Sequence, residues 1–213
     1  MALRLREIAL RLDEDESLLP DKIAHALGVD PGIITEWTIV RKGIDARRKS
    51  DILRVYTVDF SCADEGAVLA RLKALNTLTE APLPEILDFQ AQQTKTRVVV
   101  VGMGPAGLFS ALALAEAGAR VTLVERGQPV EERLRDVRSF QTGGTLNPES
   151  NVQFGEGGAG TFSDGKLTCR LNHPATATVL QRLVDFGAPQ EILVQAKPHI
   201  GSDRLRAVLV NCR

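Results

Sequence analysis

The sequence predicts an α/β protein with two domains, at residues 1–92 and 93–213. Two observations in the second domain support this prediction. Four valines at 98–101 run directly into a glycine-rich turn at 102–107, which is typical of a strand fully buried in a parallel sheet. An apolar stripe at helical spacing follows, and then a second β-branched run that ends at Glu125. The order of strand, glycine turn, helix and strand is that of a Rossmann-like nucleotide-binding domain.

The N-terminal segment predicts a small α+β domain. Amphipathic patterns favour helices over 20–27 and 67–78. The last predicted strand is apolar on both sides, which favours burial on both faces. We expect the helices to cover one face of the sheet. The predicted strands lie near residues 3–10, 37–44 and 52–60, and the linker to the second domain at 81–84 and 90–96.

A basic cluster at 41–49 has two interpretations. It is either a solvated loop or a contact for an anion or nucleic acid. The residues at 23–37 faintly resemble a helix-turn-helix, in which Asp30 caps a brief second helix. That second helix is too short to fill a major groove, and strands follow it, so we disfavour this interpretation.

The glycine-rich turn has the sequence Gly102-Met103-Gly104-Pro105-Ala106-Gly107, in the pattern G-x-G-x-x-G. Gly102 allows the tight turn off the strand, Gly104 lets a diphosphate approach the backbone, and Gly107 lets the helix pack close to the strand. Pro105 suits the first turn of the helix, where a backbone N–H would be unpaired in any case. The N–H groups and the dipole at this end of the helix favour a bound diphosphate.

Glu125 ends the second strand of this unit, eighteen residues after Gly107. A carboxylate at this point can accept hydrogen bonds from both hydroxyls of an adenosine ribose. The turn and the acid together predict an adenine-dinucleotide site. A plain βαβ unit without a ligand is the alternative.

A second glycine-rich run follows, with five glycines between Gly155 and Gly165. It is either a flexible surface loop or a backbone segment that passes close to a cofactor, and we favour the second interpretation. The predicted contacts in this run are Gly157, Gly158, Gly160, Thr161, Ser163 and Lys166, the last three as side-chain donors.

Helices are predicted on either side of this run. The first is a charged helix over 131–138, with Glu131 and Arg135 spaced to pair. An amphipathic helix is predicted over 175–186, a strand over 192–194, and a last helix capped by Ser202.

The composition is that of an ordinary globular protein, with 44% hydrophobic and 25% charged residues among 213. A net charge of −1 and 4% aromatic residues argue against nucleic acid as a partner, and no apolar run suits a membrane helix or a signal peptide. Three scattered cysteines argue against a disulfide framework or a metal site and favour the cytoplasm. A small-molecule substrate is expected, without its identity, and no catalytic side chain is assigned.

The turn Gly-x-Gly-Pro-Ala-Gly-Leu at 102–108, together with Glu125-Arg126-Gly127, resembles the N-terminal signature of FAD-binding flavoproteins of the glutathione-reductase type. This resemblance implies FAD as the cofactor, Arg126 as a further binding residue, and NAD(P)H as a candidate electron donor. In such proteins a glycine-rich segment commonly runs beside the flavin, which here is the run at 155–165.

The whole chain also resembles the N-terminal part of a little-characterised family of bacterial FAD-dependent dehydrogenases, most distinctively at 42–48 and 151–161. In that family a small α+β domain precedes the flavin fold, and its members are longer than this chain. The resemblance implies an FAD-dependent oxidoreductase whose FAD/NAD(P)-binding domain is incomplete here. Such enzymes use a further glycine-rich segment near the C-terminus, whose acid binds the ribityl chain or the flavin phosphates, and nothing after Arg126 clearly supplies this segment or a substrate domain. A non-catalytic module that binds a nucleotide, nucleic acid or protein is the alternative.

Overall fold

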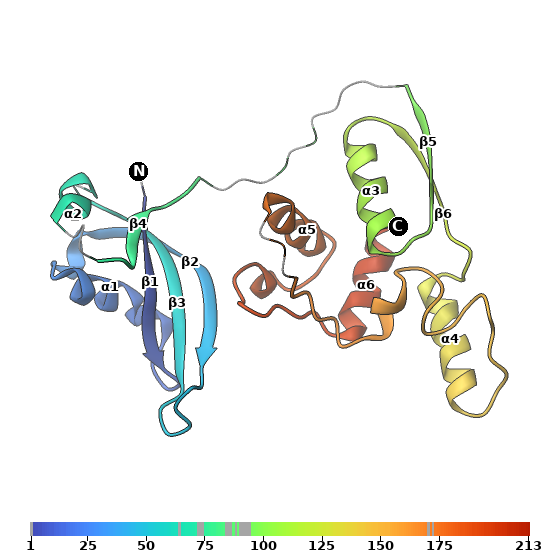
Figure 1. Ribbon diagram of the computed structural model, residues 1–213, viewed down its shortest axis with the longest axis horizontal. Helices are drawn as coiled ribbons and strands as arrows, with labels where there is room; N and C mark the ends of the chain where they lie inside the picture. Colours follow the sequence, from blue (N-terminus) through green and yellow to red (C-terminus); the bar gives the residue numbers. More distant parts are fainter. Residues whose placement is uncertain are drawn as a thin grey trace. The chain divides into compact units, whose positions relative to one another are not determined.

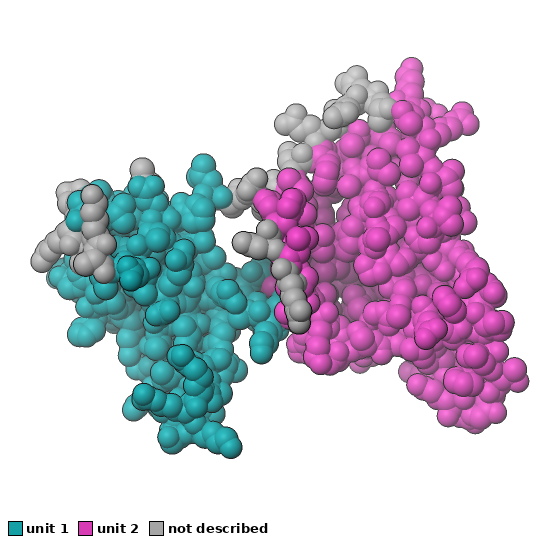
Figure 2. All heavy atoms as spheres, in the orientation of Figure 1, with its two compact units in different colours: residues 1–84, 193–198 teal, residues 85–192, 199–213 magenta. Residues whose placement is uncertain are grey.

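The computed structural model describes residues 2–63, 65–71, 75–83, 87, 89, 95–169, 171 and 173–213. The chain is mixed α/β, as predicted (Figure 1). It forms two compact units, one of residues 1–84 and 193–198, the other of residues 85–192 and 199–213 (Figure 2). The boundary predicted between residues 92 and 93 lies outside the described residues, as does most of the predicted linker.

The N-terminal unit is built on an antiparallel sheet of four strands in the order β2-β3-β1-β4. The strands are β1 (Leu3–Arg11), β2 (Ile34–Asp45), β3 (Leu53–Cys62) and β4 (Leu78–Glu80). The helical segments are η1 (Glu16–Leu18), α1 (Leu19–Leu27), η2 (Pro31–Ile33) and α2 (Glu65–Arg71). The three predicted strands and the first predicted helix are confirmed.

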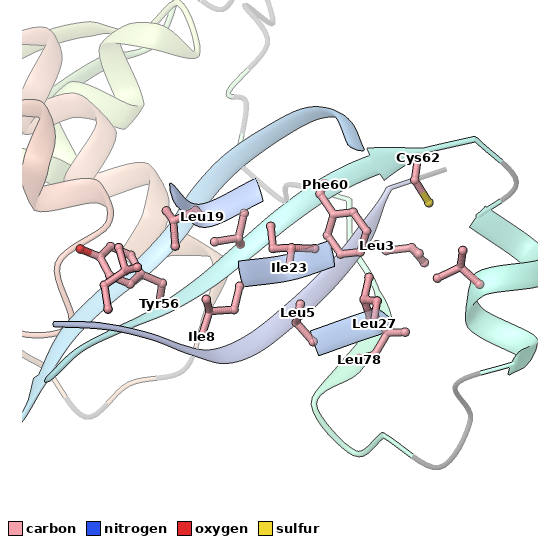
Figure 3. Packing of buried hydrophobic residues seen from close by; sticks show 13 residues of the cluster. Leu3, Leu5, Ile8, Leu19, Ile23, Leu27, Tyr56, Phe60, Cys62 and Leu78 are labelled. Atoms are coloured by element: carbon pink, nitrogen blue, oxygen red, sulfur yellow. The ribbon is translucent and has the colours of Figure 1, made fainter. Parts of the chain in front are cut away.

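One face of this sheet carries the hydrophobic core, and α1 packs its apolar stripe against it (Figure 3). In β3 the buried side chains alternate with half-buried ones, so the strand is buried mainly on one face. This differs from the sequence prediction, which favoured burial on both faces. The residues that form the centre of the core are Leu3, Leu5, Leu10, Leu19, Ile23, Leu27, Tyr56, Val58 and Phe60.

One sequence prediction for this unit is wrong in its C-terminal part. The helix predicted over 67–78 is present as far as Arg71 in α2, but the described residues 75–78 are not helical, and Leu78 lies in β4, where it pairs with Leu5. The sheet core takes up the leucine, and tertiary packing overrides the helical pattern. The helix-turn-helix interpretation was disfavoured from the sequence, and the structure agrees, because the second helix is only η2, which Asp30 caps as predicted before β2 begins. Asp64, the predicted cap of the second helix, lies outside the described residues.

The C-terminal unit begins with a parallel strand pair and the helix that joins the two strands. These are β5 (Arg97–Val101), α3 (Pro105–Glu116) and β6 (Arg120–Val124). The remaining elements are α4 (Val130–Gln141), η3 (Ala159–Phe162), α5 (Pro174–Asp185), η4 (Gln190–Leu193) and α6 (Ser202–Cys212). The helices predicted over 131–138 and 175–186 are therefore confirmed.

The valine strand β5 is not fully buried, which corrects the sequence prediction. Val99 and Val101 are 64% and 81% exposed, and Val124 beside them on β6 is 45% exposed. The alternate residues Val98 and Val100 are half-buried, and α3 packs against this strand pair. Four β-branched residues in a row therefore form a strand that is covered on one face only.

Three smaller sequence predictions after Arg126 also need correction. Ile192 and Leu193 of the strand predicted over 192–194 lie in η4, and the segment 193–198, which belongs to the N-terminal unit, forms an isolated bridge between Gln195 and Lys42 of β2. The backbone N–H of Lys42 donates to Val194 O (2.7 Å), and that of Ala196 donates to Lys42 O (2.8 Å). Ser202 is the first residue of α6, and Gly201, with φ of +87°, is its N-cap. Glu131 pairs with Arg213 (2.7 Å) in place of the predicted Arg135.

Glu7 lies in a bulge of β1. The register of β1 against β3 shifts between Leu5 and Ile8, and Glu7 has φ of +63°, in the left-handed region. The side chain of Glu7 is exposed. The free-energy cost of this conformation therefore comes mainly from strain in the backbone and not from side-chain packing.

We predict that Glu7→Gly raises the free energy of unfolding by about 1 kcal/mol, because glycine adopts this φ without strain. Glu7→Val should lower it by a similar amount, because a β-branched side chain is more strained at positive φ. Urea unfolding of the three proteins measures both changes. A loss of stability in Glu7→Gly would contradict the assignment of strain to this residue.

Candidate functional site

The glycine-rich turn between β5 and α3 has the geometry that its sequence predicts. Gly102 has φ of +97°, in the left-handed region. A Cβ on Gly107 would lie 1.9 Å from the carbonyl oxygen of Gly102, so only glycine allows this close approach of helix and turn. A Cβ on Gly104 would meet no atom within 4 Å. Open space therefore lies over Gly104, where a diphosphate would approach.

The N-terminus of α3 faces this open space without a side-chain cap. Gly104 is the N-cap residue, Pro105 is the first helical residue, and Pro105 and Ala106 are exposed. The first N–H groups of a helix, together with its dipole, favour an anion at such a position.

Glu125 is fixed against the same turn. One oxygen of its carboxylate accepts a hydrogen bond from the backbone N–H of Met103 (2.7 Å), and the other accepts one from Gly127 N–H (2.8 Å). The side chain is half-buried. Each carboxylate oxygen has a second lone pair, so Glu125 can still accept hydrogen bonds from two hydroxyl groups.

The second glycine-rich run lies beside the turn. The backbone N–H of Gly157 donates to Met103 O (2.8 Å), and a Cβ on Gly158 would lie 3.4 Å from the Cα of Gly104. The structure thus brings the two glycine-rich segments together, although the sequence separates them by some fifty residues.

Arg133 of α4 holds this run in place, and the sequence analysis missed it. Its side chain is fully buried, and it donates hydrogen bonds to the carbonyl oxygens of Asn151 (2.8 Å), Val152 (2.9 Å) and Glu156 (2.6 Å). The guanidinium also lies over the ring of Phe162, 4.9 Å from its centroid. Burial lowers the pKa of Arg133, and the nearby carboxylates of Glu125 and Glu156 oppose this shift.

Glu156 is the buried acid of the same cluster. One carboxylate oxygen accepts from the backbone N–H of Val130 (2.6 Å), at the start of α4, and from Arg213 (3.2 Å). The acid therefore caps the helix that carries Arg133. The sequence carried one signal for the burial of Arg133, because at helical spacing this arginine shares a face with the apolar residues Val130 and Val137. In the structure all three are buried.

The predicted side-chain donors of the run form bonds within the protein. The hydroxyl of Thr161 is buried, accepts from Arg133 (3.2 Å) and donates to Glu156 O (3.1 Å). Ser163 donates to Gly160 O (2.7 Å), and Lys166 pairs with an acid two residues earlier, Asp164 (2.9 Å). Ser163 and Lys166 are exposed at the surface.

An apolar cavity of about 220 Å³ adjoins the turn and the run. Several predicted site residues line it. Its other walls are mostly apolar side chains of α3, α5 and α6, including Phe109, together with Gly165 and Leu167 of the chain after η3. The predicted residues along its edge are Pro105, Gly157, Gly160, Ser163 and Lys166.

Arg126 contacts two residues that sequence reasoning missed, Glu149 and Phe154. Its Nε atom lies 2.9 Å from a carboxylate oxygen of Glu149, and its guanidinium lies 4.7 Å from the ring centroid of Phe154. No spacing in the sequence indicates these contacts, because the partners are more than twenty residues from Arg126.

Comparisons with known proteins agree with this geometry. Residues 2–61 match the model of a domain of unknown function (DUF8436), and residues 97–137 match the model of an FAD binding domain. The second match supports FAD binding and is consistent with a flavoenzyme family.

Two relatives were found among known proteins. An uncharacterized protein of Clostridium beijerinckii is 42% identical over 214 residues, which is 100% of this chain and 40% of that protein. A thiamine thiazole synthase of Aeropyrum pernix is 46% identical over 59 residues, which is 28% of this chain and 22% of that protein. This chain therefore spans less than half the length of either relative.

Among the residues that the structure describes, no helix has the length and apolar character needed to cross a membrane. In this same part of the chain, no group of histidine, cysteine and acidic side chains is placed to hold a metal ion.

Arg133→Met should destabilise the protein by about 3 kcal/mol, because the carbonyl oxygens of Asn151, Val152 and Glu156 lose their donor and the buried carboxylate of Glu156 loses a nearby positive charge. Arg135→Met, which removes an exposed arginine from the same helix, should change stability by less than about 0.5 kcal/mol. Urea unfolding of both variants tests this. Equal effects of the two substitutions would contradict the role of Arg133.

Proposed function

We propose that the protein is an FAD-dependent oxidoreductase with a Rossmann-like FAD-binding domain of the glutathione-reductase type, from the family of bacterial dehydrogenases that its sequence resembles. The observation that best supports this proposal is the open space over Gly104, with the fixed carboxylate of Glu125 at the same turn. The match of residues 97–137 to an FAD binding domain adds independent support.

The residues present fit an adenine dinucleotide. Backbone groups from Gly102 to Gly107, at the N-terminus of α3, would hold the diphosphate, and Glu125 would accept from the ribose hydroxyls. The negative charge of Glu125 would reject a ribose with a 2′-phosphate. These roles require only the open space and the free lone pairs described above.

The second glycine-rich run would lie beside the flavin end of the cofactor. The backbone of Gly157, Gly158 and Gly160 faces the turn or the apolar cavity, with Ser163 and Lys166 at the cavity edge. Thr161 would act by holding the run to Arg133, because its hydroxyl is already bonded within the protein. FAD, when bound, supplies hydride transfer through its ring system.

Several parts of this proposal go beyond the nucleotide site. NAD(P)H as the electron donor, a small-molecule substrate, the absence of membrane and nucleic-acid partners, and the cytoplasmic location remain predictions from the sequence. The activity of the whole protein is likewise proposed, because the relative in Clostridium beijerinckii is much longer than this chain.

The alternative, a binding module that uses the basic cluster at 41–49, has less support. Arg47 forms an ion pair with Asp45 in which two guanidinium nitrogens donate to the carboxylate. These hydrogen bonds lower the pKa of the Asp45 carboxyl to about 2. Part of the cluster is therefore neutralised within the hairpin. No specific contact favours an external anion over this internal pair.

Two substitutions at Gly104, to valine and to alanine, test the proposed function. Gly104→Val should weaken binding of FAD and of ADP at least tenfold, because the branched side chain fills the space of the diphosphate and removes charge-assisted hydrogen bonds. Gly104→Ala should have an intermediate effect. The thermal midpoint should not fall in either variant, because Gly104 has φ of −72° and open space at its Cβ.

Calorimetric titration with each ligand measures the affinities. Binding of ADP and FAD to Gly104→Val as tightly as to the parent would contradict the assignment of the turn. A parent chain that does not bind ADP would contradict the proposed function itself, because ADP needs only the turn and Glu125.

A further inference from the structure

We infer that Arg126, Glu149 and Phe154 form a platform on which the adenine base of the bound nucleotide stacks. This inference rests on the proposed nucleotide site and assigns to it a base-recognition element. Phe154 and Glu149 act as positioning residues for the guanidinium of Arg126.

The guanidinium plane of Arg126 is held on two sides. The ring of Phe154 supports it at 4.7 Å, and the carboxylate of Glu149 pairs with Nε at 2.9 Å. A guanidinium held by an aromatic face and an acid loses much of its rotational freedom. It is therefore preorganised to receive a second flat group.

The platform is open to a ligand. The side chains of Arg126 and Glu149 are 59% and 54% exposed, and Phe154 is 43% exposed. These exposed fractions leave the guanidinium and the ring accessible to a ligand.

The backbone beneath the platform is fixed. A Cβ on Gly127 would lie 2.4 Å from the Cα of Gly155, and the N–H of Glu156 donates to Gln128 O (3.2 Å). Arg133 binds the carbonyl oxygens on either side of Phe154, at Val152 and Glu156. The position of Phe154 under Arg126 is therefore set by buried contacts.

The location of the platform identifies its ligand as the base of the nucleotide. Glu125, the proposed ribose acceptor, immediately precedes Arg126, and its carboxylate is bonded to Gly127. The base of a nucleotide is bonded directly to its ribose, so a base bound here extends past Glu125 toward Arg126. Arginine planes and aromatic rings both stack on bases, and a purine offers the larger surface.

The experiment compares ADP with UDP, which share the ribose and the diphosphate and differ in the base. The parent chain should bind ADP at least about tenfold more tightly than UDP. Phe154→Leu and Arg126→Lys should each remove most of this preference, by weakening ADP binding while leaving UDP binding nearly unchanged. Phe154→Tyr, which keeps the ring, should retain the preference.

Phe140→Leu is the matched control, because Phe140 is a phenylalanine of similar exposure (46%) that lies on α4, outside the platform. It should leave both affinities unchanged. Equal thermal midpoints show that the variants keep the fold. Tight ADP binding that Gly104→Val abolishes but Phe154→Leu does not change would overturn the platform and leave the proposed function standing. Failure of the parent to bind either nucleotide would contradict both.

Discussion

The buried guanidinium of Arg133 is the interaction on which the C-terminal unit depends. A segment with five glycines in eleven residues has a large conformational entropy. The side chain of Arg133 opposes that freedom, because it binds the carbonyl oxygen of Glu156 and the hydroxyl of Thr161 within the segment, and the carbonyl oxygens of Asn151 and Val152 just before it. The glycines make this arrangement possible, because a Cβ on Gly155 would lie 2.6 Å from the Cδ atom of Arg133. The run is therefore an ordered part of the protein, and its glycines are the places where backbone, arginine and helix meet.

The ordered run connects the rest of the unit to the glycine-rich turn between β5 and α3. Gly157 bonds to the turn through Met103, and a Cβ at Gly157 would lie 2.4 Å from Leu209 of α6. The last helix, the run and the turn are thus packed as one body within this unit. Glu125 belongs to the same body, because its carboxylate ties the end of β6 to the turn. A nucleotide bound to this turn meets a preorganised surface, and little binding energy is lost to ordering it.

The sequence predicted what local spacing controls, and missed what distant contacts decide. The strand, turn and helix at 97–116 follow from residue types whose backbone requirements are local, such as Gly102 and Gly107. Arg133 was missed because a charged residue on a polar helix is normally solvated, and its partners are eighteen to twenty-eight residues away. The exposure of Val101 could not be predicted either, because a β-branched run does not reveal how many layers cover it. Leu78 illustrates the same limit, since a strand partner and not its own helical pattern fixed its place.

The central claim is that the turn and the Arg133-held run form one adenine-nucleotide site. Hydrogen exchange of backbone amides, measured with and without saturating ADP, tests it most directly. The account predicts slower exchange at 102–107, 125–128 and 155–160 when ADP is bound, and unchanged exchange at the basic cluster 41–49. Protection confined to 41–49, or unchanged exchange at 102–107 under saturating ADP, would contradict the claim.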